Sequence, residues 1–451
     1  MNMWRNTILG GAWLLWAWRR VHALAYRGLE RFSVGPSARA RPGASGRRVH
    51  ALAYMALLML VACGNGVEEE VAVAPEDPVA ALRQALMDVA PGGVVTIPEG
   101  RLDVDRGLSL SVSGVTVRGA GSDRSVLSFA GQRAGAEGLL VTADDVTLEG
   151  FAVEDTRGDA IKVSGCRNIV MRDVRAEWTG GPSSDNGAYG LYPVQCDGVL
   201  IEHAVAIGAS DAGIYVGQSR DIIVRHSRAE YNVAGIEIEN SIGADVYGNE
   251  VRHNTGGILV FDLPGLPMQG GRETRVFRNL VIDNNTPNFA PEGNIVGTVP
   301  AGTGILVSAN RDVQIFANRI QEHGSASIMV LSYLITERPF DDPDYDPYPQ
   351  RVHVHDNYFG RSGYAPDSEP LAMLAQALER DLPPLLWDGF IREGASDPVI
   401  CAHDNSEADA MILDAPGGFA DARFAVDTFD CQLQPLAGIS DADADVAVGW
   451  E

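Results

Sequence analysis

Eight side chains between residues 159 and 239 could bind or transform a ligand. Three are tyrosines, four are carboxylic acids and one is the only lysine of the chain: Asp159, Lys162, Tyr189, Tyr192, Asp211, Tyr215, Glu237 and Glu239. Tyrosine rings that stack on sugar faces, beside carboxylates and a single cation, would suit an extended carbohydrate chain. The alternative is an ordinary solvated surface of mixed polar residues.

The carboxylic acids also have a spacing that suits hydrolysis. Glu237 and Glu239 are two residues apart in the sequence, so on a strand they would lie on one face about 7 Å apart. Glycoside hydrolysis requires two carboxyl groups roughly 5 to 9 Å apart. Asp211 belongs to the preceding sequence repeat and would lie beside them.

The elements that must position these residues repeat along the chain. Ile214, Ile236 and Ile258 are 22 residues apart and begin similar apolar segments. A unit this short, with β-branched and alternating residues, indicates strands rather than pairs of helices. The equivalent first apolar residues of the repeats are Ile161, Leu191, Ile214, Ile236, Ile258, Ile305 and Ile328.

Each repeat contains a second short strand with a conspicuous polar position after it. Asparagine occupies this position in the later repeats, which predicts amides that bond to one another from coil to coil. The aligned residues are Asp173, Ala204, Ser227, Asn249, Asn279, Asn318 and Asn357. The sequence therefore predicts an all-β fold, a right-handed parallel β-helix solenoid with coils about 4.8 Å apart.

The residue after each repeat anchor should point out of the solenoid, because side chains alternate along a strand. This stripe consists of Lys162, Tyr192, Tyr215, Glu237, Leu259, Leu306 and Met329. Insertions begin or end at the same strand, at residues 179–187, 263–272, 286–302 and 335–349. We expect their loops to wall a groove over this face.

The solenoid is predicted to span residues 77–360. Asp77 can cap a short amphipathic helix over residues 78–90, with Pro78 at its first position, and this helix would cover one open end. Residues 361–451 change to helical and irregular, acidic sequence. They are predicted to form a C-terminal α/irregular cap.

Two pairs of cysteines fit the repeat register. Cys166 and Cys196 each follow a repeat anchor by five residues, so they should lie one above the other within disulfide distance. A bridge and a buried, unlinked pair both fit this position. Cys401 and Cys431 remain as a second pair, whose connectivity the sequence leaves open.

The N-terminal region differs from the repeats. The segment RRVHALAY occurs at residues 19–26 and again at 47–54, which indicates a duplicated or misassigned start followed by a secretory signal within residues 1–62. The segment Leu60 to Gly64 resembles a bacterial lipobox, and this resemblance implies lipidation of Cys63. Residues 63–76 would be a tether to a membrane.

The formal net charge of −25 argues against nucleic acid as a partner, because phosphate backbones require basic surfaces. No spacing typical of a metal site occurs in the sequence. The acidic run at 341–347 could supply carboxylates for Ca²⁺ from Asp341, Asp342, Asp344 and Asp346.

The repeats NGAYGLYPVQ, AGIYVGQS, VAGIEIEN and GGILVFDLP resemble the right-handed β-helix superfamily that includes pectin lyases. They are most similar to bacterial lipoproteins with paired parallel β-helix repeats. The resemblance covers residues from about 92 to 360.

A narrower resemblance concerns mannuronan C5-epimerases, which have a Tyr-Gly-x-Asp-Pro-His motif and a lysine on the preceding coil. Residues 189–194 read YGLYPV, so Tyr189 matches the motif, while Tyr192 replaces its aspartate and Val194 its histidine. The resemblance implies that Lys162 neutralises a uronate carboxylate and that Tyr189 or Tyr192 transfers a proton. His203 and His226 lie on a different strand, where structural roles are expected.

The sequence therefore predicts a lipid-anchored protein of the bacterial cell envelope whose groove binds a polysaccharide. Its side chains are compatible with lyase, epimerase or hydrolase chemistry, with Lys162, Tyr189 and Tyr192 as the catalytic residues. The alternative is a non-catalytic envelope scaffold that binds a protein partner.

Overall fold

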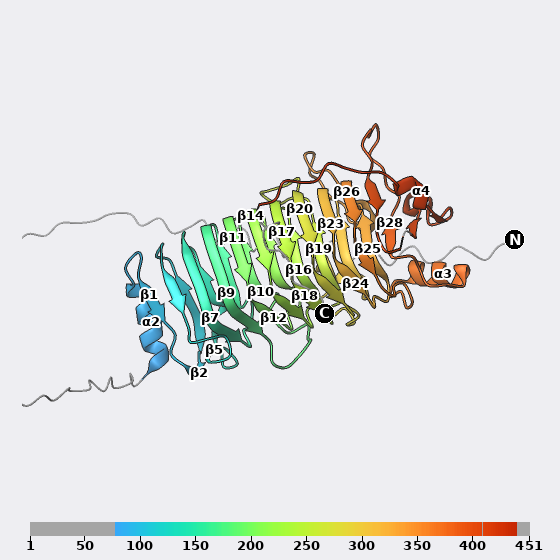
Figure 1. Ribbon diagram of the computed structural model, residues 1–451. Coiled ribbons are helices and arrows are strands. Elements are labelled where there is room, and N and C mark those ends of the chain that lie inside the picture. Colours follow the sequence, from blue (N-terminus) through green and yellow to red (C-terminus); the bar gives the residue numbers. More distant parts are fainter. Residues whose placement is uncertain (1–76, 408, 440–451) are drawn as a thin grey trace, which may run out of the picture. The chain divides into compact units, whose positions relative to one another are not determined.

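A computed structural model describes residues 77–407 and 409–439. The predictions for residues 1–62, for the tether at 63–76 and for Cys63 lie outside the described residues. The described chain is a right-handed parallel β-helix, as predicted (Figure 1). Among these residues, no helix is both long enough and apolar enough to cross a membrane.

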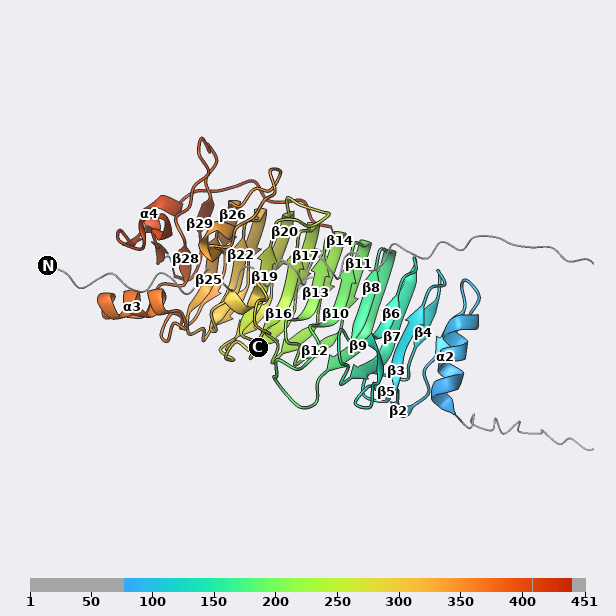
Figure 2. The ribbon, with the colours of Figure 1, turned by 180° about the vertical axis from the view of Figure 1, so that it is seen from behind.

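One side of the solenoid is a 12-stranded sheet, whose strands lie side by side along the coil axis in Figure 2. All of its pairings are parallel except the last, between β30 and β31. Its strands are β3 (Arg106–Leu110), β6 (Ala134–Val141), β8 (Ile161–Ser164), β10 (Tyr189–Val194), β13 (Ala212–Gly217), β16 (Ala234–Glu239), β19 (Gly256–Phe261), β22 (Thr303–Ser308), β25 (Ala326–Leu331), β28 (Leu385–Trp387), β30 (Ala410–Ile412) and β31 (Arg423–Phe424).

The rest of each coil belongs to a 19-stranded sheet. Two long strands in it, β7 and β9, each pair with two shorter strands of a neighbouring coil. Its strands are β1 (Val94–Thr96), β2 (Gly100–Asp103), β4 (Thr116–Arg118), β5 (Ser125–Ser128), β7 (Val146–Glu154), β9 (Arg167–Glu177), β11 (Asp197–Glu202), β12 (Val205–Ile207), β14 (Arg220–Arg225), β15 (Arg228–Glu230), β17 (Ile242–Tyr247), β18 (Glu250–Arg252), β20 (Arg272–Phe277), β21 (Leu280–Ile282), β23 (Arg311–Phe316), β24 (Arg319–Gln321), β26 (Gln350–His355), β27 (Tyr358–Phe359) and β29 (Ile400–His403).

The predicted repeat register is confirmed. The anchors from Ile161 to Ile328 pair with one another from coil to coil, and each is fully buried in the interior. The register continues through Leu385 and Ala410, so the predicted boundary at residue 360 falls inside the solenoid. The reason is that β28 and β30 are short strands and that a long insertion separates β28 from β25, which hides the repeat.

The ends carry the expected helical segments. α2 (Pro78–Asp88) begins at the N-cap Asp77, whose carboxylate accepts hydrogen bonds from the amides of Val79 and Ala80, and it buries Leu82 and Leu86 against the first coils. α3 (Glu369–Leu378) and α4 (Val426–Phe429) lie at the other end (Figure 1). The short 3-10 helices are η1 (Val296–Thr298), η2 (Tyr333–Thr336) and η3 (Ala415–Gly417).

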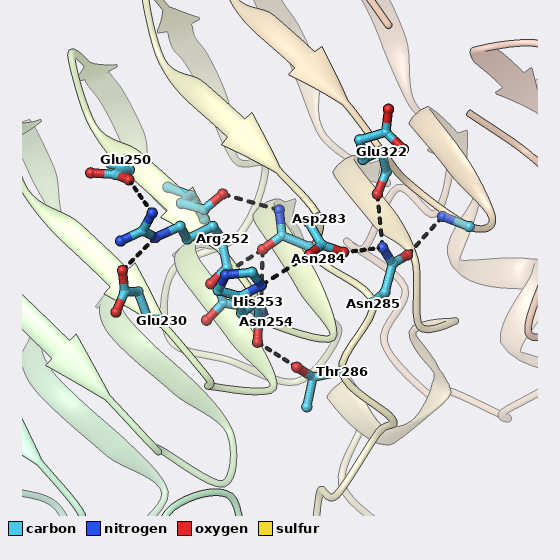
Figure 3. Close-up of polar contacts among 12 residues, drawn as sticks. Glu230, Glu250, Arg252, His253, Asn254, Asp283, Asn284, Asn285, Thr286 and Glu322 are labelled. Carbon is cyan, nitrogen blue, oxygen red and sulfur yellow. Dashed lines mark hydrogen bonds and ion pairs between the residues drawn. The ribbon is translucent and has the colours of Figure 1, made fainter. Parts of the chain in front are cut away.

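The predicted asparagine ladder is present. Asn249, Asn279, Asn318 and Asn357 each donate a side-chain hydrogen bond of 3.0 Å to the asparagine of the next coil, and the ladder ends at Asn405. A second ladder, which was not predicted, runs from Asn232 through Asn254 to Asn284, and Figure 3 shows its Asn254 and Asn284. These amides satisfy buried backbone groups at the turns of each coil.

Disulfides join Cys166 to Cys196 and Cys401 to Cys431. The first pair connects equivalent positions of adjacent coils, with 4.5 Å between the Cα atoms. The choice between a bridge and an unlinked pair is thereby made in favour of the bridge. Each disulfide crosslinks residues 30 positions apart.

Replacing an interior rung of the asparagine ladder should destabilise the solenoid. Asn318→Ala leaves the amide of Asn279 and the carbonyl of Val276 without the partners they have in the native chain. We expect the free energy of unfolding to fall by about 2 to 4 kcal/mol in chemical denaturation. Gln84→Ala, on the exposed face of α2, is the control and should change it by less than about 0.5 kcal/mol. Equal effects would show that the ladder does not stabilise the fold.

Candidate functional site

The outward stripe has the predicted register. Lys162 pairs with Tyr192 on the next strand. Farther along, Tyr215 pairs with Glu237, and the pairing continues from strand to strand through Leu259 and Leu306 to Met329. The stripe continues with Leu386 on β28 and Met411 on β30, beyond the predicted end of the solenoid. Its first part is polar and its second part is apolar, so one face of the solenoid has two chemically different regions.

Three tyrosines form a contiguous group in the polar region. The ring of Tyr189 lies 4.4 Å from that of Tyr192 and 4.6 Å from that of Tyr215, and Tyr192 and Tyr215 meet edge to face at 4.9 Å. Tyr215 lies across Gly217, where any side chain would collide with its ring. Tyr189 and Tyr192 are half-buried, whereas Tyr215 is buried.

Carboxylic acids surround these rings. The hydroxyl of Tyr215 donates a 2.7 Å hydrogen bond to Glu239, and the hydroxyl of Tyr189 lies 3.5 Å from Asp211. Glu237 and Glu239 lie two residues apart on β16, and both are buried. We name these three tyrosines with Asp159, Lys162, Asp211, Glu237 and Glu239 the tyrosine–acid patch; all eight residues predicted from the sequence belong to it.

Burial keeps several of these acids protonated to unusually high pH. It raises the pKa of Asp211 to about 7, assisted by the negative charge of Glu239. Burial and the nearby charge of Asp211 raise the pKa of Glu237 well above its usual value, and burial also raises the pKa of Glu239. Because these acids cannot all ionise at close range, the patch holds protons near neutral pH.

The lysine is already engaged by protein carboxylates. The Nζ of Lys162 lies 3.7 Å from Asp159 and 4.0 Å from Glu137, and 4.8 Å from the centre of the Tyr192 ring. Burial raises the pKa of Asp159 to about 6, and the charge of Lys162 limits this rise. Lys162 is therefore a neutralised cation within the patch.

The predicted groove is only partly open. Residues 286–302 cover the stripe, and Val296 and Val299 pack in one cluster with Leu259, Leu306 and Met329. Glu237 is only 1% exposed and Tyr215 only 3%, so these two predicted ligand contacts are enclosed. The predicted groove over this face is corrected for the apolar part of the stripe, because the insertion lies on that part and buries it.

Asn294 of this insertion was not found from the sequence. Its side chain donates a 3.3 Å hydrogen bond to Asp211, so the insertion is attached directly to the patch. At its base, Thr286 hydrogen-bonds the backbone of His253 (Figure 3). Asn294 lies in an insertion and therefore occupies no repeat position. The only signal in the sequence was the long interval between two repeats, which indicated an insertion but not this residue.

The other predicted sites have ordinary structural contacts. Asp342 accepts hydrogen bonds from the amides of Gly265 and Asp344, and Asp346 forms an ion pair with Arg392. Among residues 77–407 and 409–439, no group of three or more His, Cys, Asp or Glu side chains is arranged to hold a metal ion. Calcium binding at Asp341, Asp342, Asp344 and Asp346 stays a prediction. His203 and His226 stack at 5.6 Å.

The raised pKa of Asp211 predicts a pH dependence of stability. The folded state retains a proton that the unfolded chain releases, so the free energy of unfolding should fall as the pH rises from about 4 to about 7, by up to about 1.4 kcal/mol per pH unit. Asp211→Asn removes this titration, and its stability should decline less steeply than that of the wild type over the same range.

Denaturation at a series of pH values measures the two slopes. Asp144→Asn is the control, because a hydrogen bond from Arg167 lowers the pKa of Asp144, which therefore titrates below this range. Identical slopes for Asp211→Asn and the wild type would contradict the prediction.

Comparisons with known proteins agree with this architecture. A protein-family model described as "Right handed beta helix region" matches residues 110–262 and 183–334, whereas no curated protein matches the chain. Similar solved structures include a mannuronan C-5 epimerase A-module of Azotobacter vinelandii, with 17% identity over 72% of this chain and 89% of that one and a TM-score of 0.48. An alginate lyase of a Paenibacillus species has 15% identity over 64% of this chain and 96% of that one, with a TM-score of 0.43. An alpha-1,3-glucanase of Streptomyces thermodiastaticus has 19% identity over 74% of this chain and 52% of that one, with a TM-score of 0.43. The chain is a right-handed parallel β-helix protein.

Proposed function

We propose that the tyrosine–acid patch binds a neutral polysaccharide. The observation that carries this proposal is the contiguous group of three tyrosine rings, two of them half-buried, beside acids that hold protons near neutral pH. The exposed parts of Tyr189 and Tyr192 offer apolar ring surface for sugar faces. Among the carboxyl groups, that of the half-buried Asp159 offers a hydrogen-bond partner for sugar hydroxyls.

The charges around the patch favour a neutral sugar over a uronate. The single cation, Lys162, faces both Asp159 and Glu137, so it has no spare charge with which to neutralise a substrate carboxylate. Burial and the charge of Asp211 raise the pKa of Tyr189, and burial and the charge of Asp159 raise that of Tyr192. Neither hydroxyl is therefore prepared to act as a base, which argues against epimerase or lyase chemistry.

Hydrolysis is the second candidate activity, because Asp211 has the properties of a general acid. With its pKa raised to about 7, this carboxyl group is protonated in part of the molecules at neutral pH and can donate a proton to a leaving oxygen. Asp159, whose pKa is raised to about 6, would be mainly ionised at the same pH. Asp159 and Asp211 precede β8 and β13, which are two coils apart, about 9.6 Å. This spacing is at the upper end of the range in which a base can activate water on the opposite side of the bond.

Removing the most exposed ring surface should weaken sugar binding. Tyr192→Ala is expected to lower the affinity for a bound neutral polysaccharide by about two- to tenfold, measured by titration calorimetry against a panel of neutral and acidic polymers. Tyr192→Phe keeps the ring and should bind nearly as tightly as the wild type. Tyr358→Ala, at an exposed tyrosine on β27 of the other sheet, is the matched control.

The same panel also separates the alternatives. Release of reducing ends that Asp211→Asn abolishes without loss of binding would support hydrolysis. Tight binding of acidic polymers that is lost in Lys162→Ala would overturn the assignment of a neutral ligand. If no polymer binds, the carbohydrate proposal fails and the non-catalytic scaffold for a protein partner takes its place.

The proposal extends to a lipid anchor on the bacterial cell envelope. It rests on the apolar run that ends in Leu60, Cys63 and Gly64 and on the polar segment that follows it. In a bacterial host, labelled palmitate should enter the wild-type protein and be absent from Cys63→Ser. A variant at a disulfide-bonded residue, Cys431→Ser, should still be labelled. Equal labelling of Cys63→Ser would exclude Cys63 as the lipidated residue.

A further inference from the structure

An apolar pocket of about 350 Å³ lies over the outward face of β19, β22 and β25. Its floor consists of Phe261, Leu306 and Met329, and its walls include Ile295, Leu371 and Phe419. The volume is within the range of small-molecule sites, which are usually preformed and lined mainly by apolar groups. Among the residues that line it, the only charged side chain is that of the exposed Glu337.

Insertions from distant parts of the chain build this pocket and are braced against one another. Within residues 286–302, Asn288 donates hydrogen bonds of 3.0 Å to the carbonyls of Val296 and Val299. Arg338, which follows η2, donates bonds of 3.2 Å to the carbonyls of Gly293 and Asn294. Leu371 of α3 packs in the same apolar cluster. These contacts fix the positions of the walls around a preformed space.

The pocket adjoins the tyrosine–acid patch in two places. Phe261, on its floor, pairs in register with Glu239 of the patch. Asn294 hydrogen-bonds Asp211, while its neighbour Ile295 lines the pocket. A polar site that holds protons and a wholly different apolar site are therefore neighbours on one face of the solenoid.

We propose that the pocket holds the hydrocarbon chain of an amphipathic glycoconjugate whose sugar part lies on the tyrosine–acid patch. This inference rests on the proposed function and specifies its ligand class. The lining has a few hydroxyl groups but consists mainly of apolar side chains. Sugar hydroxyls or a peptide backbone in the pocket would therefore lose more hydrogen bonds to water than they regain, whereas a hydrocarbon chain loses none. The neighbouring patch supplies the polar contacts that such a ligand needs at its other end.

A series of alkyl glucosides tests this assignment on the purified full-length protein. Methyl, octyl, decyl and dodecyl glucosides, each below its critical micelle concentration, are titrated beside the corresponding fatty alcohols. Affinity should rise by about fourfold for each added methylene group until the pocket is full. Glucosides should bind more tightly than alcohols of the same chain length.

Variants separate the two halves of the site. Leu331→Trp, at a half-buried position in the pocket lining, should fill the space and abolish the dependence on chain length. Thr298→Trp, at an exposed lining position, is a second blocking variant in case the first unfolds. Met87→Trp, at an exposed site on α2, is the matched control and should bind like the wild type. Tyr192→Ala should weaken all glucosides by a similar factor and preserve the effect of chain length.

Three results would overturn the proposal, in two distinguishable ways. Sugar binding without any effect of chain length, or a chain-length effect that persists in both blocking variants, would remove the hydrocarbon from this pocket while leaving the proposed function intact. Equal affinity for glucosides and alcohols, unaffected by Tyr192→Ala, would remove the sugar from the patch and thereby overturn the proposed function as well.

Discussion

The stacking of equivalent interior positions from coil to coil is the constraint on which the rest of the structure depends. A single coil cannot bury its apolar face, so each must present the same buried positions as its neighbours. The anchors from Ile161 to Ile328 meet this requirement with complete burial. The turns must also satisfy buried backbone groups, and the ladders through Asn279 and Asn254 do this by repeating one amide per coil.

The interior register also dictates the arrangement of the outer face. Lys162 and Tyr192 are 30 positions apart in sequence, yet they are direct neighbours because their anchors pair. Insertions do not disturb this order, because they leave the solenoid between strands and return in register. Ile258 and Ile305 pair although residues 286–302 intervene. Chemically active side chains from successive coils are therefore brought together on one rigid sheet.

The covering of that sheet gives the face its chemistry. A carboxylic acid in water would be ionised at neutral pH, but Asp211 and Glu237 are buried, and burial raises their pKa values. The insertion at residues 286–302 bonds to Asp211 through Asn294 and packs against Leu259 and Leu306, where it forms one wall of the apolar pocket. A single insertion thus contacts both the acids of the patch and the neighbouring apolar pocket.

The sequence by itself determined the register, and with it the solenoid, the outward stripe and the membership of the tyrosine–acid patch. These follow from local patterns, namely a 22-residue apolar repeat, side-chain alternation and the asparagines at the turns. The coils beyond residue 360 were missed because β28 and β30 are too short to show a pattern. The second ladder was also missed, because only the three residues Asn232, Asn254 and Asn284 form it.

Only the tertiary structure decided which patch residues are accessible, that Lys162 is neutralised by Glu137 as well as Asp159, and that an apolar pocket adjoins the acids. These properties depend on where irregular insertions lie, and insertions have no periodicity from which their path can be read. Asn294 reaches Asp211 from 83 positions away in sequence. Burial, and therefore protonation, is a property of such long-range contacts and not of local sequence.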